Sequence, residues 1–306
     1  MLLLNVVFIH SQIKDFDNIT CSSYYENFNK AKLTFVKGSL DFDVLDSLIQ
    51  KSLSTNNNPL SVDLFFALNV YAKHCKEERF LSISKKLLSN GVDKKIIFQD
   101  VPVCINKKNI KKSLENYNFY NNKNKEVISI LNKIKKADEK SQSLLISNRR
   151  RELINTKNYN LLIDIINQIG KWPGISVTGQ DLNIYHVDIS HDFTQALLHF
   201  NTSQIESLLP HLFQAVQNKE LSPYHFARIY DYYYIKKTAN EGIKKILQDE
   251  NINGEQKQLT DIISKQFFGI YKSKNKKEIY PPVINPNNLR QRREKICMLG
   301  EDLNLK

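Results

Sequence analysis

Apolar residues recur at the spacing of an α-helix along nearly the whole chain, and this pattern constrains the fold more than any single motif. In residues 41–54 the apolar side chains are three or four positions apart, which places them on one face of a helix. The same spacing returns in four further segments, residues 61–71, 77–90, 161–169 and 203–216. Strand-like alternation is confined to residues 175–177 and 279–284. The chain is therefore predicted to be mostly α, with at most one or two short strands.

Residues that favour helix ends mark several boundaries. Ser61 is predicted to cap the helix that follows it, and residues 203–206 form a capping-box pattern ahead of another helix. Ser222 followed by Pro223 is the combination expected where a helix begins. The same device precedes the last predicted helix, residues 287–298.

The length of 306 residues and the composition along the chain favour two parts. Residues 13–105 are predicted to be a helical region, whose central pair of helices resembles one tetratricopeptide hairpin and needs neighbours to cover its apolar face. Residues 106–125, rich in Lys and Asn, are predicted to be a linker. Residues 126–306 then form a compact helical domain. Its first helix is predicted to carry an apolar stripe of Val127, Leu131, Ile134, Leu144 and Leu145.

The N-terminus favours export from the cytoplasm. Residues 1–9 are apolar, but a membrane-spanning helix needs about 20 apolar residues, so no membrane span is predicted. Residues 1–12 resemble the end of a signal peptide that lacks its basic start, with cleavage near Ser11 or Gln12. A buried N-terminal strand in a cytoplasmic protein is the alternative. The prediction is a periplasmic or secreted protein.

The formal net charge of +12 raises the question of a nucleic-acid partner. The basic residues cluster in predicted loops and linkers, where charge runs usually keep a surface solvated. No nucleic-acid partner is therefore predicted. The four cysteines are isolated along the chain, which excludes metal fingers; their even number permits disulfides without indicating any.

Short motifs follow one another in a set order through the second half of the chain. They are residues 170–174 with a Trp-Pro turn, Gly179, residues 185–188 with His-x-Asp, residues 230–231, residues 266–269, and residues 282–293 ending in Arg-Arg. This order resembles the bacterial domain of unknown function 6624, over about residues 126–306. The resemblance implies helical hairpins in front of the domain but no activity. Tyr185, Tyr232 and the pair Ile270–Tyr271 depart from the family pattern, which implies that part of any catalytic site is lost.

His186, Asp188 and Asp231 are the candidate catalytic residues. In an extended segment, residues two apart share a side, so His186 and Asp188 can form a general-base pair or hold a metal. Their spacing matches no metalloenzyme signature, and which metal, if any, is bound is left undetermined. The alternative interpretation makes His186 a partly buried residue that bonds to backbone.

Trp172, Gln266, Arg290 and Arg293 are the candidate ligand-binding residues. An indole offers both apolar area and a donor, and two arginines three apart on a helix can clamp a carboxylate or phosphate. The alternatives are a core position for Trp172 and ion pairs with nearby glutamates for the arginines. The sequence holds no glycine-rich phosphate loop and no other cofactor fingerprint, so no cofactor is predicted.

Two functions are left open by these residues. The first is an exported helical binding or protein-interaction module, whose partner protein contacts the N-terminal helical region. The second is a hydrolase in which His186 acts as base, oriented by Asp188 or Asp231, with Gln266 as a polar contact to substrate.

Overall fold

The computed structural model describes residues 21–38, 41–99, 101–115, 117, 123–181, 193–248, 264–272 and 281–300, with side chains throughout except for residues 242–248. Within these ranges the protein is all helical, apart from one isolated parallel β-bridge between Gln266 and Val283. The prediction of a mostly α fold is confirmed, and the bridge falls in one of the two segments where strand pairing was expected.

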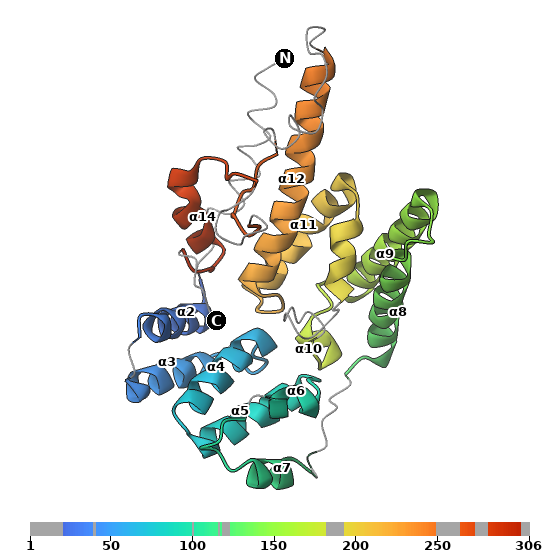
Figure 1. Ribbon diagram of the computed structural model, residues 1–306. Helices are drawn as coiled ribbons and strands as arrows, with labels where there is room; N and C mark the ends of the chain where they lie inside the picture. The colour runs from blue at the N-terminus through green and yellow to red at the C-terminus, as the bar shows by residue number, and fades with distance from the viewer. Residues whose placement is uncertain are drawn as a thin grey trace.

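The helices of the first half are α2 (Ser23–Val36), α3 (Phe42–Ser54), α4 (Ser61–Lys73), α5 (Glu77–Ser89), α6 (Lys94–Gln99) and α7 (Lys107–Glu115). Helix α2 packs on α3 and α4 on α5 as antiparallel pairs, and α7 contacts α5 (Figure 1). The predicted hairpin is present as α4 and α5. Rings of Tyr24, Tyr25, Phe28 and Phe66 meet edge to face between α2 and α4, and all four side chains are buried. The apolar faces of α2 and α4 therefore cover one another.

The second half is also built from helical pairs. Its elements are α8 (Lys125–Ser141), α9 (Asn148–Ile169), α10 (Ile175–Thr178), the 3₁₀ helix η1 (Phe193–His199), α11 (Thr202–Gln217), α12 (Pro223–Gln248), the 3₁₀ helix η2 (Pro286–Asn288) and α14 (Leu289–Lys295). Figure 1 shows the α8–α9 hairpin at one side of the molecule, with α11 and α12 between it and α14. The helix η1 fills the space between α8, α9 and α12.

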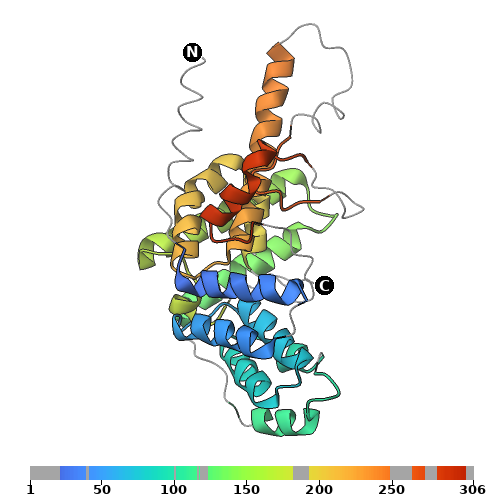
Figure 2. The ribbon, with the colours of Figure 1, turned by 90° about the vertical axis from the view of Figure 1, so that its left-hand side faces the viewer.

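Helix α2 joins the two halves (Figure 2). The Tyr25 hydroxyl donates to the carbonyl oxygens of Val216 and Leu221, at 3.1 and 3.2 Å, beside the turn between α11 and α12. Cys21, just before α2, forms a disulfide with Cys297, just after α14, with 5.4 Å between their Cα atoms. The first helix described is thus fixed against the last one.

A second disulfide joins Cys75 to Cys104, with 5.6 Å between the Cα atoms, so all four cysteines are paired. It links the α4–α5 turn to the segment ahead of α7. The sequence permitted disulfides but gave no pairing, because neither pair is close along the chain.

Three local predictions need correction. The N-terminus of α4 is capped from outside: the Ser61 N–H donates to a carboxylate oxygen of Asp181 at 2.7 Å, and the N-cap residue is Leu60. The capping box of α11 lies two residues earlier than predicted, with Asn201 as the N-cap. Residues 175–177 belong to α10 rather than a strand, because the chain turns there and ends the helix at a left-handed Gly179.

Two predictions near the centre of the chain also change. Part of the predicted linker forms α7, which buries Ile110 and Leu114, so the division into domains at this stretch stays a prediction. Helix α8 ends at Ser141, which leaves Leu144 and Leu145 in the turn beyond it, almost fully exposed. Val127, Leu131 and Ile134 are buried as expected.

The predicted signal segment, residues 1–12, lies outside the described residues. Among the helices that the structure describes, none has the length and apolar character needed to cross a membrane.

Candidate functional site

The sequence-predicted site residues fall into three places. His186 and Asp188 lie outside the described residues. Asp231, Gln266 and Arg293 meet around residues 266–271, here called the clamped loop. Trp172 and Arg290 lie elsewhere, and apart from each other.

Asp231 holds the clamped loop by its backbone N–H groups. Its carboxylate accepts from the N–H groups of Phe267, Phe268 and Ile270, at 2.7, 2.6 and 2.8 Å. The side chain projects from α12 and is completely buried. Both carboxylate oxygens are thus occupied by the loop, which leaves Asp231 poorly placed to orient a catalytic histidine.

Gln266 closes the clamped loop on itself. Its side-chain carbonyl accepts from the Tyr271 N–H at 2.7 Å, and its amide donates to the carbonyl oxygens of Tyr271 and Pro281 at 2.9 and 2.6 Å. Its backbone pairs with residues 282 and 284 at the β-bridge. Because it is fully buried, Gln266 faces the loop rather than solvent.

The arginines of α14 hold the carbonyl side of the same loop. Arg293, 2% exposed, donates to the carbonyl oxygens of Phe268 and Gly269 at 2.8 and 3.1 Å. Arg292 donates to those of Phe267 and Ile284 at 2.8 and 2.7 Å. The Asp231 carboxylate therefore accepts from the N–H groups of this buried turn, and the guanidinium groups donate to its carbonyl oxygens. Gly269 takes a positive φ of 67° within the turn. The Arg-Arg motif acts here on backbone, not as an open anion clamp.

Burial raises the pKa of the Asp231 carboxyl from 3.8 to about 6, while the N–H groups of Phe268, Ile270 and Phe267 and the Arg293 guanidinium act to lower it. The folded chain therefore binds this proton more tightly than the unfolded chain does. Folding takes up a proton between about pH 4 and pH 6, so the contribution of this group to stability falls as pH rises through that window.

We expect the free energy of unfolding of the wild type to fall with rising pH between about pH 4 and pH 6, by about 3 kcal/mol more than in Asp231→Asn. Because the amide of Asn does not titrate, the substitution removes the contribution of residue 231 to the pH dependence of stability. Urea unfolding at a series of pH values measures both slopes. Equal slopes would show that Asp231 keeps the same protonation state in the folded and unfolded chain.

Trp172 is a core residue. Its indole is 2% exposed and stacks on Phe193 of η1, with 5.8 Å between ring centroids. The turn that carries it connects α9 to α10, so the tryptophan anchors η1 against that turn.

Arg290 is the predicted ligand-binding residue that reaches solvent. Its side chain is 71% exposed and its Nε donates to Glu294 at 2.8 Å. It borders a crevice of about 360 Å³ between α2 and α14, here called the α2–α14 crevice. The crevice lining combines charged and apolar side chains: Glu26, Asn29, Lys30, Leu33, Arg290, Glu294, Met298 and Leu299, with Gly300. It lies next to the Cys21–Cys297 disulfide.

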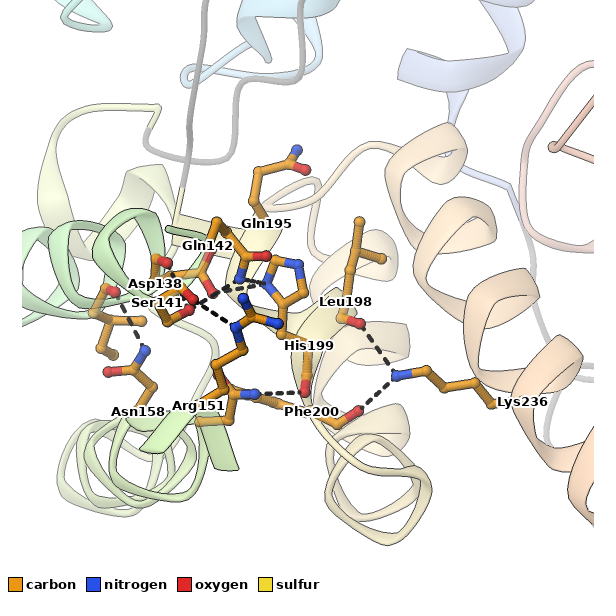
Figure 3. Close-up of polar contacts among 12 residues, drawn as sticks. Asp138, Ser141, Gln142, Arg151, Asn158, Gln195, Leu198, His199, Phe200 and Lys236 are labelled. Carbon is orange, nitrogen blue, oxygen red and sulfur yellow. Dashed lines mark hydrogen bonds and ion pairs between the residues drawn. The ribbon is translucent and has the colours of Figure 1, made fainter. Parts of the chain in front are cut away.

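A second polar cluster, which the sequence did not indicate, gathers around His199 at the end of η1 (Figure 3). The His199 Nδ1 lies 2.7 Å from a carboxylate oxygen of Asp138 on α8, and 3.2 Å from the Gln142 amide nitrogen. Asn155 of α9 donates to the His199 carbonyl oxygen at 3.0 Å. Lys236 of α12 donates to the carbonyl oxygens of Leu198 and Phe200. Polar side chains from three helices thus satisfy the end of η1.

An imidazole held at Nδ1 by a buried carboxylate is the arrangement of a general base and its orienting acid. His199 is partly exposed, yet it lines neither the α2–α14 crevice nor the hollow along α8 between Lys125 and Lys136. Among the described residues, the pair joins α8 to η1 and borders neither of these two hollows. The sequence does carry one indication of this pair. Asp138 continues the buried stripe of Val127, Leu131 and Ile134, and a carboxylate in a buried position needs a hydrogen-bonding partner.

Comparison of the chain with protein-family models, with curated proteins and with solved structures finds no match. The resemblance of residues 126–306 to the domain of unknown function 6624 therefore stays a prediction.

Proposed function

We propose that this chain is an exported helical binding module that holds its ligand or partner protein in the α2–α14 crevice. The observation that carries the proposal is the contrast between the predicted site residues. Asp231, Gln266 and Arg293 are buried and engaged by backbone, whereas Arg290 presents its guanidinium at an open crevice. A side chain that already holds the fold is a poor choice for a contact with an incoming molecule.

Export is supported by the two disulfides, since such bonds persist in oxidising compartments and are rare in the cytoplasm. The apolar residues 1–9 favour the same route. We therefore propose a periplasmic or secreted location. Separately, the order of motifs in residues 170–293 supports the proposal that residues 126–306 belong to the domain of unknown function 6624.

The crevice chemistry favours a segment of a partner protein. Leu33, Met298 and Leu299 supply apolar lining, while Lys30 and Arg290 supply donors for carboxylates or carbonyl oxygens. Because α2 forms one wall, the partner would contact the N-terminal helical region. The disulfide beside it fixes the two walls relative to each other, which lowers the ordering cost of binding.

Thermal unfolding against peptides and carboxylate- or phosphate-bearing metabolites tests the proposal. A ligand at a hundred times its dissociation constant should raise the free energy of unfolding by about 2.7 kcal/mol. We expect this gain in the wild type, its loss in Arg290→Ala, and its retention in Lys135→Ala, which removes a basic residue that likewise lies near a glutamate four positions on, Glu139. A gain that survives in Arg290→Ala would remove the crevice from the proposal.

A hydrolase that uses His186 with Asp188 is the alternative. The engagement of Asp231 and Gln266 by the clamped loop counts against their part in it. The same assay separates the two functions. A ligand-induced gain lost in His186→Ala and Asp188→Ala, but kept in Arg290→Ala, would favour the hydrolase.

A further inference from the structure

The turn between α8 and α9, residues 142–147, exposes aliphatic side chains at the free end of a helical hairpin. Leu144 is 96% exposed and Leu145 is 94% exposed, and Leu153 in the second turn of α9 is 65% exposed. Figure 1 shows this end of the hairpin at the edge of the molecule, away from the stack of α2 to α7. Two adjacent leucines that contact almost nothing are unusual in a folded chain, and such apolar patches mark interaction sites.

Hydrogen bonds hold the backbone of this turn in place, while its two leucine side chains are exposed to solvent. Arg151 donates to the carbonyl oxygens of Ser141 and Ser143, at 3.0 and 3.1 Å. Ser147 caps α9 by accepting from the Arg150 N–H. Through Ser141 and Gln142 the turn also adjoins the His199–Asp138 pair. The leucines are therefore presented by an ordered turn and do not fold back onto the hairpin.

Basic side chains surround the exposed leucines. Residues 133–157, which include the turn, carry eight Lys or Arg and three Asp or Glu, and one of those acids is Asp138, buried against His199. Arg151 is engaged by the carbonyl oxygens of the turn and is only partly exposed, whereas the neighbouring Lys136, Lys140, Arg149 and Arg150 are all exposed. The end of the hairpin thus carries exposed leucines and, close to them along the chain, an excess of exposed positive charge.

We propose that the α8–α9 turn is a membrane-docking tip, which inserts Leu144 and Leu145 into the interface of an anionic phospholipid bilayer while the surrounding Lys and Arg contact lipid phosphates. Partial insertion of apolar side chains, together with attraction to anionic lipids, is how proteins bind a membrane surface without crossing it. The neighbouring basic side chains favour an anionic bilayer as the occupant, because lipid phosphates above acyl chains match positive charge beside two exposed leucines. The proposal is independent of the α2–α14 crevice, which involves other elements.

Vesicle sedimentation of the full oxidised chain tests this inference. We expect binding to phosphatidylcholine vesicles that contain phosphatidylglycerol, and little binding to phosphatidylcholine alone. Each basic residue close to an anionic surface contributes about fivefold to the partition coefficient, and each leucine that leaves water contributes up to about tenfold. Leu144→Ser with Leu145→Ser, and separately Arg149→Gln with Arg150→Gln, should each lower partitioning by at least about tenfold. Added salt should weaken binding further.

Matched controls remove similar groups from other surfaces. Val44→Ser with Val103→Ser deletes two exposed apolar side chains, and Lys107→Gln with Lys108→Gln deletes two exposed charges of α7. Both should leave partitioning within about twofold of wild type. Equal losses in the controls, unchanged binding in the leucine variant, or no wild-type binding to anionic vesicles would each overturn the proposal. The last outcome would direct attention to a protein partner for the tip.

Insertion itself has a spectroscopic readout. Leu145→Trp places an exposed indole at the tip, while the one native tryptophan, Trp172, is buried and gives a constant background. Anionic vesicles should shift the emission of this variant to shorter wavelength and leave the wild-type emission unchanged. An unshifted spectrum in the presence of bound vesicles would show that the tip stays outside the lipid.

Discussion

Arg293→Ala should lower the free energy of unfolding by about 3–5 kcal/mol. The guanidinium is buried and donates to the carbonyl oxygens of Phe268 and Gly269, and its charge favours the ionised form of Asp231. Alanine would leave these carbonyls without the Arg293 donors and would remove the positive charge that favours the ionised form of Asp231. Both losses carry the cost of an unsatisfied polar group in a dry environment.

Urea unfolding of paired variants on α14 measures this effect. Arg290→Ala is the matched control, since it lies three residues earlier on the same helix and forms an exposed pair, and its loss should be about 0.5 kcal/mol or less. Arg293→Lys should recover only part of the stability, because an ammonium cannot reproduce the planar fork of donors. A loss in Arg293→Ala no larger than in Arg290→Ala would contradict the role assigned to the clamped loop.

The sequence predicts helices well where the apolar period is long and flanked by helix-ending residues. Helices α4 and α5 lie within a residue or two of their predicted bounds, and α12 begins at Pro223 as expected. In such segments the intrinsic helix preference of the residues and the burial of their apolar face favour the same structure, so the sequence pattern alone identifies the helix. The apolar period continues past Ser141 and so predicts Leu144 and Leu145 on the stripe of α8, although the helix ends at Ser141.

The polar sites were far less predictable, since their meaning depends on groups remote in sequence. Asp181 caps α4 from 120 residues away, and Asp138 meets His199 from 61 residues away. The sequence identifies the arginines of the last helix, but that Arg293 is buried while Arg290 reaches solvent follows only from how α14 packs on the clamped loop. A sequence motif shows which polar groups are present. Whether those groups stabilise the fold or bind a ligand depends on the residues that they contact in the folded chain.

Removal of the Cys21–Cys297 disulfide should lower the free energy of unfolding by about 4–5 kcal/mol. The bond joins residues 276 apart and so restricts most of the unfolded chain, whereas Cys75–Cys104 spans 29 residues and should contribute about 3.5 kcal/mol. The longer bond also holds α2 against α14, where the Asn29 amide donates to the Cys297 carbonyl oxygen at 2.9 Å. Its loss should therefore loosen the walls of the α2–α14 crevice.

The double variants Cys21→Ser with Cys297→Ser, and Cys75→Ser with Cys104→Ser, separate the chain-entropy effect from local packing. The first should unfold at lower urea and with a steeper dependence on urea, because its unfolded state is more expanded and exposes more surface. The second, with its shorter loop, should change the slope little. If the long-range variant lost no more stability than the short-range one, the bond would have to be strained in the folded chain or redundant with the contacts of Tyr25 and Asn29.

Protein recovered from its native compartment without free thiols would support export, since four reduced cysteines are expected in the cytoplasm.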